Sequence, residues 1–578
     1  MDQCLIAAFD QGYERMAAWS DLLDAINLYP VADSDTGRNL RISLAPLKNL
    51  KTGDVPGHLL MSAIGNSGNI AGAFFAEFSR IEIMTELLES AGAGRDAAWR
   101  ALQDPKRGTM LSVFDALVEV LLEKSLKSKD KSIFQIDPEA VITGMRYSVL
   151  STSDELAELR NAGVVDSGAL GMFLFFEGFF RSLFNQLHLL CNPYELYGDK
   201  LKIPSTIEVS SHPAFCIDTV IVPSLGLDEA LQRLSGMGEH VVTVSDGRHL
   251  KVHLHAHDEE SARKDLADVG NLMRWQSEKI DSRPAQWSAI KADTETVHIV
   301  TDAAGSLSME VARELGITLL DSYVMIDQRL LPESTVSAKT LYGAMSRGVK
   351  VTTCQASVFE RHQRYECLAQ RFANIVYLCV GSAYTGNYET AKRWAESNRN
   401  GHRMALVDTG AASGRLGLVA RRAAKFANSG NSLTRVVEYA GNLCLKCDEL
   451  IFLDQLKFLA AGGRISKASG FVGDLLNIKP VIRPGRKGAQ KVGVVKNHNA
   501  QVEFLLDYIG KKLNGQSPSE ILLQFTDNYD RVVSHIQPQI RKHLPGSPIS
   551  VQPMSATSGV HMGPGTWAAA FLSYDSCK

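Results

Sequence analysis

The chain has 578 residues, more than the ~250 to 300 at which a single hydrophobic core stops growing, so we expect two to four domains. With 45% hydrophobic, 22% charged and 7% aromatic residues, the composition is that of a globular protein and excludes disordered and collagen-like classes. The net charge is only −3 and the basic residues are scattered, which argues against a nucleic-acid partner.

The beginning of the chain and its most apolar stretch both favour a cytoplasmic protein. MDQCLIAAFDQGYERM has acids within its first ten residues and lacks the basic and apolar regions of a signal peptide. GALGMFLFFEGFFRSLF contains Glu177 and Arg181 and falls short of the ~18 uncharged residues of a membrane helix, so it predicts a buried helix. Nine cysteines, an odd number, favour reduced thiols over a disulfide framework. We therefore expect no integral membrane segment.

Residues 1 to about 195 are predicted to be helical throughout. Apolar residues recur at spacings of three and four in LIAAFDQGYERMAAW, LLMSAIGNSGNIAGAFFAEF and MLSVFDALVEVLLEKSL. From about residue 205, short β-rich runs such as DTVIVP, HVVTVSD and HLKVHLHAH alternate with helical pieces, which predicts a small mixed domain. The polar stretch SRPAQWSAIKADTE, residues 282–295, suits a linker.

From residue 297 onward, apolar strands alternate with helices in the βα rhythm of a largely parallel sheet; the strands are VHIVTD, ANIVYLCVG, RMALVDTG, ILLQFTD and PISVQPM. The predicted domains are thus an all-α domain over residues 1–198, an α+β domain with its linker over 199–292 and an α/β domain over 293–578. Polar turns at strand ends of the last domain are candidate sites, because ligands of open α/β sheets bind there.

Three stretches rich in glycine and acids each precede an apolar helix: PVADSDTGRN, IGNSGNIAG and AGVVDSGALG. A helix that begins with the turn from Gly65 to Asn69 offers free N–H groups for phosphate, although ordinary capping by Ser or Asn is an alternative. Asp33 and Asp35 repel each other, which a solvated loop tolerates. A bound Mg²⁺ ion would offset this repulsion, because it is coordinated by one or two carboxylates together with phosphate oxygens.

No GxxxxGK[ST] motif occurs, so the chain is not a P-loop enzyme. The three stretches, in this order, resemble the nucleotide-binding domain of the dihydroxyacetone-kinase type, and most closely its version in bacterial fatty acid kinases. The resemblance implies an α-helical barrel with ATP at one end and Mg²⁺ on Asp33 and Asp35. The residues expected to bind the nucleotide cofactor are Asn27, Asp33, Asp35, Asn66, Ser67, Gly68 and Asp166. Ala32, Ser34 and Asn69 depart from the family pattern, which has glycine in place of Ser34.

HLKVHLHAHD places His253, His255 and His257 on one face of a predicted strand. Same-face neighbours lie ~6.6 Å apart, so all three cannot bind one ion on a straight strand. A pair of them with a third ligand would bind zinc, and Cys216 is the nearest upstream soft ligand. The alternative is an exposed polar strand face. Residues 205–280 also resemble the middle domain of fatty acid kinases, whose Cys and His-x-His positions match Cys216, His253 and His255; this implies a metal-bearing or dimer-forming module and Zn²⁺ as a further cofactor.

TTCQAS, GSAYTGNY, AAGGRIS and GVHMGPG lie at the ends of strands or helices of the third domain. Residues 297–575 resemble the DegV family of fatty-acid-binding proteins across nearly the whole domain. By that match Thr353 and Ser382 would donate hydrogen bonds to the ligand carboxyl group, and Arg464 and His561 would lie near the transferred phosphate as catalytic residues. The positions that depart from the pattern are Cys354, Ala356, Gly381 and Asn387.

Together these resemblances predict an ATP-dependent fatty acid kinase with its own lipid-binding module, which produces an acyl phosphate. A fatty acid is the expected ligand, an enzyme that accepts the acyl phosphate an expected partner, and a homodimer the expected assembly. A kinase for a small dihydroxyacetone-like compound is one alternative, against which the DegV-like half argues. The other is a lipid carrier or sensor whose kinase half has decayed, for which the ADSD sequence is the main argument.

Overall fold

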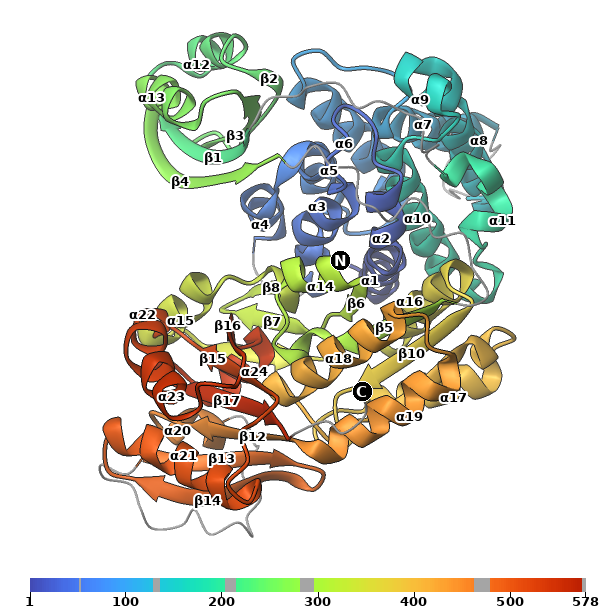
Figure 1. Cartoon of the computed structure of the whole chain (residues 1–578). Helices are drawn as coiled ribbons and strands as arrows, with labels where there is room; N and C mark the ends of the chain where they lie inside the picture. Colours follow the sequence, from blue (N-terminus) through green and yellow to red (C-terminus); the bar gives the residue numbers. More distant parts are fainter. Residues whose placement is uncertain (51–53, 128–135, 203–214, 281–295, 462–478, 574–578) are drawn as a thin grey trace. The chain divides into compact units, whose positions relative to one another are not determined.

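The computed structural model describes residues 1–50, 54–127, 136–202, 215–280, 296–461 and 479–573 (Figure 1). The chain forms two compact units, Met1–Lys291 and Ala292–Lys578. The first contains a helical part followed by a small sheet with two helices, and the second combines strands and helices throughout. The multidomain fold class is confirmed, whereas the division into three domains at the stated boundaries stays a prediction. The predicted linker, residues 282–295, lies outside the described residues.

The helical part of the first unit contains one isolated β-bridge, between Leu102 and Val242, and no strand among its described residues. Its arrangement as a barrel stays a prediction. The α-helices are α1 (Gln3–Ala18), α2 (Ser20–Ala25), α3 (Thr36–Ser43), α4 (Val55–Ser62), α5 (Gly65–Phe78), α6 (Leu87–Ala101), α7 (Met110–Lys127), α8 (Pro138–Glu155), α9 (Ala157–Ala162), α10 (Ser167–Leu183) and α11 (Pro193–Tyr197).

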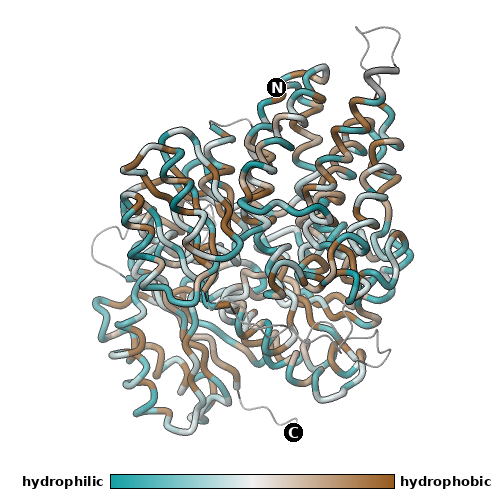
Figure 2. Tube along the Cα trace, turned by 90° about the horizontal axis from the view of Figure 1, so that it is seen from above, coloured by the Kyte–Doolittle hydropathy of each residue, from teal (hydrophilic) through white to brown (hydrophobic). Residues whose placement is uncertain are grey.

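Helix α10 is the central core element of this part, as its apolar sequence predicts. Its phenylalanines pack with those of α1 and α5; Phe9 and Phe179, for example, have ring centroids 5.1 Å apart. Glu177 is buried and accepts a charge-assisted hydrogen bond from Arg15 at 2.8 Å, so the charge inside the helix is paired. Hydrophobic and hydrophilic residues alternate along the helices (Figure 2). No helix in the described ranges is both long and apolar enough to cross a membrane.

The sheet of the first unit is antiparallel, with strand order β2-β3-β1-β4. Its elements are β1 (Phe215–Pro223), α12 (Leu227–Leu234), β2 (Glu239–Ser245), β3 (Leu250–Ala256), α13 (Glu259–Val269) and β4 (Gly270–Lys279). The apolar residues that alternate along β1 and β3 form a core with α12 and α13. The alternate, polar residues point to the other face of the sheet, and all of β3 is buried.

The burial of this polar face corrects one expectation. His253 and His255 are buried, so the alternative of an exposed polar strand face is wrong for both; His257 is exposed. The face is covered because β1, β2 and β3 pack against α5 of the helical part. The alternation of polar and apolar residues shows which residues share a face, but it does not show that a second layer covers the polar one.

The described residues of the second unit form three sheets. A parallel sheet has the order β11-β10-β5-β6, and a small antiparallel sheet has the order β8-β7-β9. Their strands are β5 (Val297–Asp302), β6 (Ile317–Leu320), β7 (Tyr323–Ile326), β8 (Arg329–Pro332), β9 (Val351–Cys354), β10 (Asn374–Cys379) and β11 (Met404–Asp408). The third sheet, with order β14-β13-β12-β17-β15-β16, comprises β12 (Cys447–Phe452), β13 (Lys479–Gly485), β14 (Gly488–Val495), β15 (Glu520–Phe525), β16 (Ile549–Pro553) and β17 (Trp567–Leu572).

The third sheet shows that the expectation of one largely parallel sheet is wrong. Strand β17 lies between β12 and β15 and is antiparallel to both, while β15 and β16 are parallel. Apolar runs identify strands without giving their direction. The α-helices of this unit are α14 (Met309–Leu315), α15 (Ala338–Ser346), α16 (Val358–Arg371), α17 (Asn387–Ser397), α18 (Ser413–Asn428), α19 (Leu433–Lys446), α20 (Lys457–Ala461), α21 (Asn499–Lys512), α22 (Tyr529–Arg531), α23 (Gln537–His543) and α24 (Ala556–Met562).

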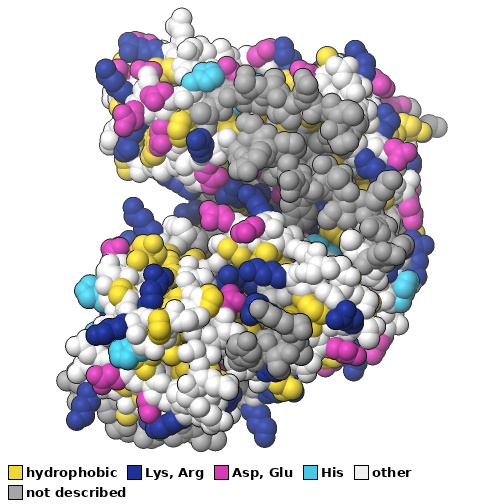
Figure 3. All heavy atoms as spheres, viewed as in Figure 1, with side chains coloured by type: hydrophobic (Ala, Val, Ile, Leu, Met, Phe, Trp, Pro, Cys, Tyr) yellow, Lys and Arg dark blue, Asp and Glu magenta, His cyan; other side chains and the backbone are white. Residues whose placement is uncertain are grey.

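Charged side chains of both signs are interspersed on the face of the molecule shown in Figure 3. Within the first unit, Arg38 of α3 donates from both terminal nitrogens to the two carboxylate oxygens of Glu278 of β4, each at 3.0 Å. The pair is partly exposed, so its contribution to stability is modest, but it links the helical part to the sheet.

Candidate functional site: a polar cavity and a cysteine–histidine cluster

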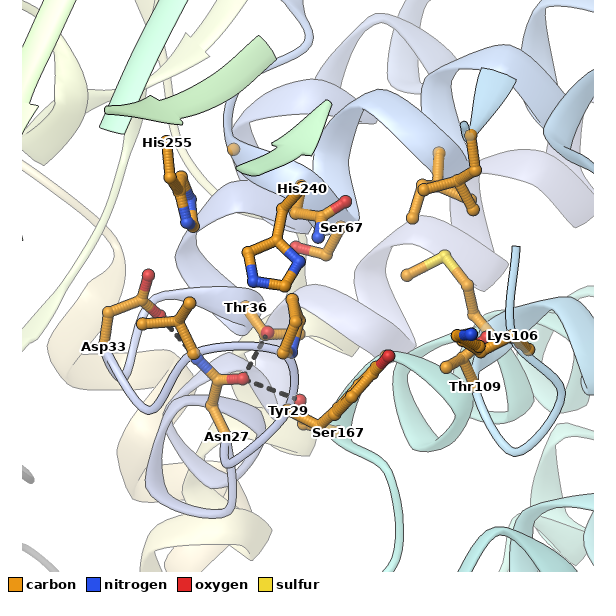
Figure 4. Close-up of a pocket in the computed structure, with 18 of the residues that line it drawn as sticks. Asn27, Tyr29, Asp33, Thr36, Ser67, Lys106, Thr109, Ser167, His240 and His255 are labelled. Carbon is orange, nitrogen blue, oxygen red and sulfur yellow. Dashed lines mark hydrogen bonds between the residues drawn. The ribbon is translucent and has the colours of Figure 1, made fainter. Parts of the chain in front are cut away.

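A cavity of about 350 Å³ opens in the first unit, between the helical part and the edge strand β2 (Figure 4). Six of the seven residues expected to bind the nucleotide line it: Asn27, Asp33, Asp35, Asn66, Ser67 and Asp166. They come from three stretches far apart in the sequence, which the fold therefore brings together. Other polar residues around the cavity are Tyr29, Thr36, Lys106, Thr109, Ser167, Cys216, Glu239, His240 and His255.

The paired aspartates lie at one side of this cavity, before α3. Asp33 accepts a hydrogen bond from the amide of Asn27 at 2.7 Å, and the amide oxygen of Asn27 accepts from Thr36 at 3.0 Å and from Ser167 at 3.4 Å (Figure 4). Burial and the neighbouring Asp35 raise the pKa of the Asp33 carboxyl well above its ordinary value. Two half-buried carboxylates side by side are unfavourable without a cation, so this pair fits Mg²⁺ better than it fits a fully solvated loop.

Ser34, between the two aspartates, has φ of +57°, the left-handed region that favours glycine. The family pattern has glycine here, and the structure shows why. Asp24 caps the following helix, because its carboxylate accepts from the N–H groups of Gly37 at 2.6 Å and Arg38 at 3.1 Å. Asp35 makes no side-chain capping bond, so its carboxylate is left facing the cavity.

The turn that opens α5 is not capped by its own Ser or Asn side chains, so that alternative is wrong. The Oγ atom of Ser67 and the Oδ1 atom of Asn66 are buried without a hydrogen-bond partner among the described residues, and both side chains line the cavity. Gly68 does not line it; a Cβ atom at Gly68 would lie 2.2 Å from the Oγ of Ser43, so this glycine is needed for packing. The unpaired hydroxyl of Ser67 at a helix N-terminus fits a phosphate ligand, whereas the Oδ1 of Asn66 is an acceptor.

Asp166 is the N-cap of α10 and accepts from the N–H of Ala169 at 2.7 Å. Burial raises the pKa of Asp166 to about 7. Its carboxyl group thus caps the helix terminus while it lines the cavity.

The sequence analysis missed the wall of the cavity formed by the start of β2. Glu239, His240 and Val241 line the cavity, and Figure 4 shows the His240 ring between Ser67 and His255. His240 has φ of +53°, and its ring centroid is 5.4 Å from that of His255. GMGEHVV contains no motif that would have identified these residues, because they reach the cavity only through the packing of the sheet on α5.

Cys216, His253 and His255 form the predicted cluster, with one ligand atom of each within 4.8 Å of the others. Strand pairing explains this, since Cys216 lies opposite His255, and Asp218 opposite His253, in the antiparallel β1–β3 ladder. The Nε2 atom of His253 is buried without a partner among the residues that the structure describes. Two imidazoles and a thiol in a buried pocket are donors that zinc prefers, so the cluster fits this ion. Cys216 and His255 also line the cavity with the aspartates.

In the second unit, two of the predicted site residues are in contact: the hydroxyl of Thr353 and the Nε2 of His561 are 3.2 Å apart. Ser382 is exposed and donates from its hydroxyl to Asp408 at 2.7 Å, and from its N–H to the same carboxylate at 3.1 Å. Arg464 lies outside the described residues. Of the two residues predicted to bind the ligand carboxylate, Thr353 thus contacts the predicted catalytic residue His561, and Ser382 is hydrogen-bonded to Asp408.

Two departures from the family patterns have structural roles. Asn387 donates to Asp302 at 2.8 Å, and this buried carboxylate also accepts from Tyr377 at 2.9 Å and from the N–H of Val380 at 2.8 Å. The Asp of the predicted VTDAAGSL strand end is therefore part of the core. Asn69 donates to Asp218 of β1 at 3.0 Å, across the contact between the helical part and the sheet.

These features describe a protein in which a helical domain with a polar cavity shares one chain with an α/β domain. Residues 30–181 match the DAK2 domain, and residues 296–574 match the family described as "Uncharacterised protein, DegV family". The chain therefore joins a DAK2 domain to a DegV-family domain.

Relatives among curated proteins include an uncharacterised protein of Staphylococcus aureus strain USA300 and one of strain NCTC 8325. Each is 25% identical over 348 residues, which cover 53% of this chain and 62% of the relative. The match thus spans less than two thirds of the length of these relatives. Among solved structures, a fatty-acid-binding DegV family protein from Thermus thermophilus is 24% identical with a TM-score of 0.45, covering 48% of this chain and 100% of its own. DegV, a fatty acid binding protein from Bacillus subtilis, is 18% identical with a TM-score of 0.44, at 48% and 100% coverage.

Proposed function

We propose that this chain is an ATP-dependent fatty acid kinase that forms an acyl phosphate. The cavity is the observation that supports this most directly, because it combines a carboxylate pair with the N-termini of α5 and α10 inside a DAK2 match. The DegV-family match in the same chain supports a fatty acid as the acceptor. ATP and Mg²⁺ are the proposed cofactors, together with one Zn²⁺ ion on Cys216, His253 and His255.

The proposed reaction needs little covalent help from the protein. A fatty acid has a reference pKa near ~4.3 and is ionised at neutral pH, so its carboxylate attacks the γ-phosphorus without a general base. A carboxylate oxygen–phosphorus bond forms while the bond from the γ-phosphorus to the bridging oxygen breaks, and ADP leaves. The protein has to position two anions and offset their repulsion.

The residues of the cavity suit that task. Asn27 fixes the orientation of Asp33, and Asp24 caps α3 in place of Asp35, so both carboxylates stay directed at the metal position. A bound Mg²⁺ ion would supply the positive charge that the phosphate oxygens and the two aspartates share. The N-terminal turn of α5 would donate N–H and hydroxyl groups to phosphate through Asn66 and Ser67.

For the second unit, we propose that Thr353 and Ser382 bind the carboxylate and that His561, with Arg464, contacts the transferring phosphoryl group. The contact between Thr353 and His561 supports this assignment, since it joins the carboxylate and phosphoryl positions. The hydroxyl of Ser382 would exchange Asp408 for the ligand. We further propose a cytoplasmic homodimer that passes its product to an acceptor enzyme.

One observation favours a second candidate, a lipid carrier or sensor with a degenerate kinase domain. Ser34 holds a backbone conformation that favours glycine, in the turn that carries both aspartates. A turn strained in this way would bind the metal less well than one with glycine.

The test is the formation of acyl phosphate from a long-chain fatty acid and MgATP, detected by trapping with hydroxylamine. We expect Asp33→Asn and Asp35→Asn to abolish Mg²⁺-dependent turnover while copurified lipid, identified by mass spectrometry, stays bound, because each change removes charge from the metal position alone. Asp199→Asn, at an exposed carboxylate, is the control and should be fully active. Full turnover in both cavity variants would remove the nucleotide assignment, and lipid binding without any acyl phosphate in the wild type would favour the carrier.

A further inference from the structure

Asp218 of β1 lies between the cysteine–histidine cluster and the turn that opens α5. Its carboxylate is buried and accepts from the N–H of Gly65 at 2.9 Å through Oδ2 and from the amide of Asn69 at 3.0 Å through Oδ1. The same Oδ2 lies 3.4 Å from the Nδ1 of His253, and Oδ1 lies 3.2 Å from the Nζ of Lys251. One carboxylate thus contacts both parts of the first unit.

Its first role concerns the cavity. The first N–H groups of a helix lack partners within the helix, and α5 has no capping side chain of its own. Asp218 supplies that cap from a strand more than a hundred residues away in sequence, at Gly65, whose φ is +64°. Gly65, Asn66 and Ser67 all line the cavity, so the position of this carboxylate sets where their N–H groups point.

Its second role concerns the cluster. The Nδ1 of His253 faces Asp218, and the Nε2 of the same ring is the buried atom without a partner in the described part of the chain. Metal-binding histidines generally donate their second N–H to a carboxylate, which fixes the tautomer and the orientation of the ring. The Nδ1 of His253 lies 3.4 Å from Asp218 and 4.0 Å from the sulfur of Cys216, so Asp218 is its nearer partner. Zinc bound through Nε2 would therefore leave Nδ1 to Asp218, which would orient the ring.

We propose that Asp218 couples the cysteine–histidine cluster to the nucleotide-binding turn, so that zinc at the cluster and nucleotide in the cavity each strengthen the binding of the other. The proposal rests on the nucleotide-binding function proposed above. A zinc ion on Nε2 leaves the proton on Nδ1, which then donates to Asp218 and holds its carboxylate against Gly65 and Asn69. Asp218 is a positioning residue, because it acts on the nucleotide through the turn.

Calorimetry on the full chain measures the coupling in both directions: the affinity for MgADP with and without bound Zn²⁺, and the affinity for Zn²⁺ with and without MgADP. Coupling between sites typically changes affinity ~5- to 150-fold, and thermodynamic linkage requires the same factor in both directions. We expect a factor in this range for the wild type. Zinc affinity is a readout that a role confined to catalysis would not change.

Asp218→Asn should reduce the factor to near one, because a neutral amide no longer holds the His253 N–H and the Gly65 N–H as a carboxylate does. Since this change leaves Lys251 buried without its counter-charge, Asn69→Ala is the second variant. It removes one bond to Asp218 together with the bond from the same amide to the Gly65 carbonyl, and it should reduce the factor in part. Glu278→Gln is the matched control. It weakens a different tie between the helical part and the sheet, the one from Arg38, and should leave the factor unchanged.

The outcomes separate this proposal from the proposed function. A wild-type chain that binds zinc and binds MgADP equally well with and without it overturns the coupling and leaves the kinase proposal standing. A wild-type chain that binds no MgADP under either condition overturns both. Absence of zinc by elemental analysis, in protein purified without chelator and titrated with Zn²⁺, overturns the coupling and the metal assignment of the cluster.

Discussion

At the scale of single residues, Ser34 tests whether the turn between the aspartates must keep its conformation. Its φ of +57° costs an L-residue ~1–2 kcal/mol, and a β-branched side chain fits this region worse. Ser34→Val is therefore expected to lower the free energy of unfolding and to weaken MgADP binding, whereas Ser34→Gly removes the strain and should raise the free energy of unfolding by up to ~1–2 kcal/mol without weakening MgADP binding. Thermal unfolding and calorimetry measure the two effects.

Ser235→Val is the matched control for Ser34, because Ser235 has an ordinary φ of −60° outside the cavity. Equal behaviour of Ser34→Val and Ser34→Gly would show that the turn tolerates another conformation, and that the spacing of Asp33 and Asp35 does not depend on it.

Individual cavity residues were predictable where a local pattern identifies them. Paired aspartates in a turn and Gly-Asn-Ser-Gly at a helix start are patterns of adjacent residues, and their residues do line the cavity, Gly68 excepted. His240 and Glu239 were not predictable, because nothing in their neighbourhood distinguishes them from an ordinary strand end. Asp218 likewise has no motif; its role follows from the pairing of β1 with β3 and from its contact with α5.

At the scale of elements, the N-terminus of α18 in the second unit is held by the buried Glu449. Its carboxyl accepts from the N–H groups of Gly414 at 3.1 Å and Arg415 at 3.2 Å and from Gln524 at 2.7 Å. Burial raises the pKa of Glu449 from its ordinary value of 4.5 to about 7. A raised carboxyl pKa means that the folded state binds the proton more tightly than the unfolded state does. The contribution of protonated Glu449 to the stability of the fold is therefore fully present below pH 4.5 and is lost as the pH rises through 7.

We expect the stability of the wild type relative to Glu449→Gln to fall by about 3 kcal/mol between pH 4.5 and 8, from ~1.4 kcal/mol for each pH unit between the two pKa values. The glutamine of the variant does not titrate, so the stability of Glu449→Gln lacks this dependence on pH. Urea denaturation of the two proteins over this pH range is the measurement. Parallel curves would show that Glu449 does not titrate between these pH values in the folded state.

Elements were predicted better than their assembly. Apolar periodicity gave the helices of the first unit and the buried helix α10, because a helix's own spacing determines which face is apolar. It did not give the antiparallel β17 or the cover over the polar face of β3, because strand direction and the packing of layers depend on residues elsewhere in the chain. The Cys216, His253 and His255 cluster was predictable because two of its members alternate on one strand.

At the scale of the whole molecule, the chain joins a DAK2 domain to a DegV-family domain, and this covalent link matters for a reaction between two anions. Tethering can supply an effective concentration around millimolar without any new contact. A separate carrier protein would have to associate at each turnover. In the proposed kinase, the link would therefore favour phosphoryl transfer to a lipid held by the same chain.

His561 has two possible roles in the proposed kinase, contact with the carboxylate or contact with the phosphoryl group, and each gives its loss a different consequence. If His561 only helps to hold a carboxylate, His561→Ala should weaken lipid binding, and activity should recover at saturating fatty acid. If it acts on the transferring phosphoryl group, charge that develops in the transition state loses its partner and the maximal rate falls. We expect a fall of ~10²- to 10³-fold that added lipid does not rescue, the usual loss for one preorganised donor, and the same for Arg464→Ala.

Thr353→Val is the matched variant, because it removes the hydroxyl that lies 3.2 Å from His561 while keeping the shape of the side chain. Since Thr353 is proposed to bind the carboxylate, this variant should raise the fatty acid concentration needed for half-maximal rate, and saturating lipid should restore most of the maximal rate. Steady-state kinetics of acyl phosphate formation against fatty acid concentration separates the two patterns, with mass spectrometry to confirm that lipid still copurifies with each variant. Full recovery of His561→Ala at saturating lipid would place His561 with Thr353 as a carboxylate-binding residue, and the phosphoryl group would then have to be stabilised by Arg464 and the DAK2 cavity without it.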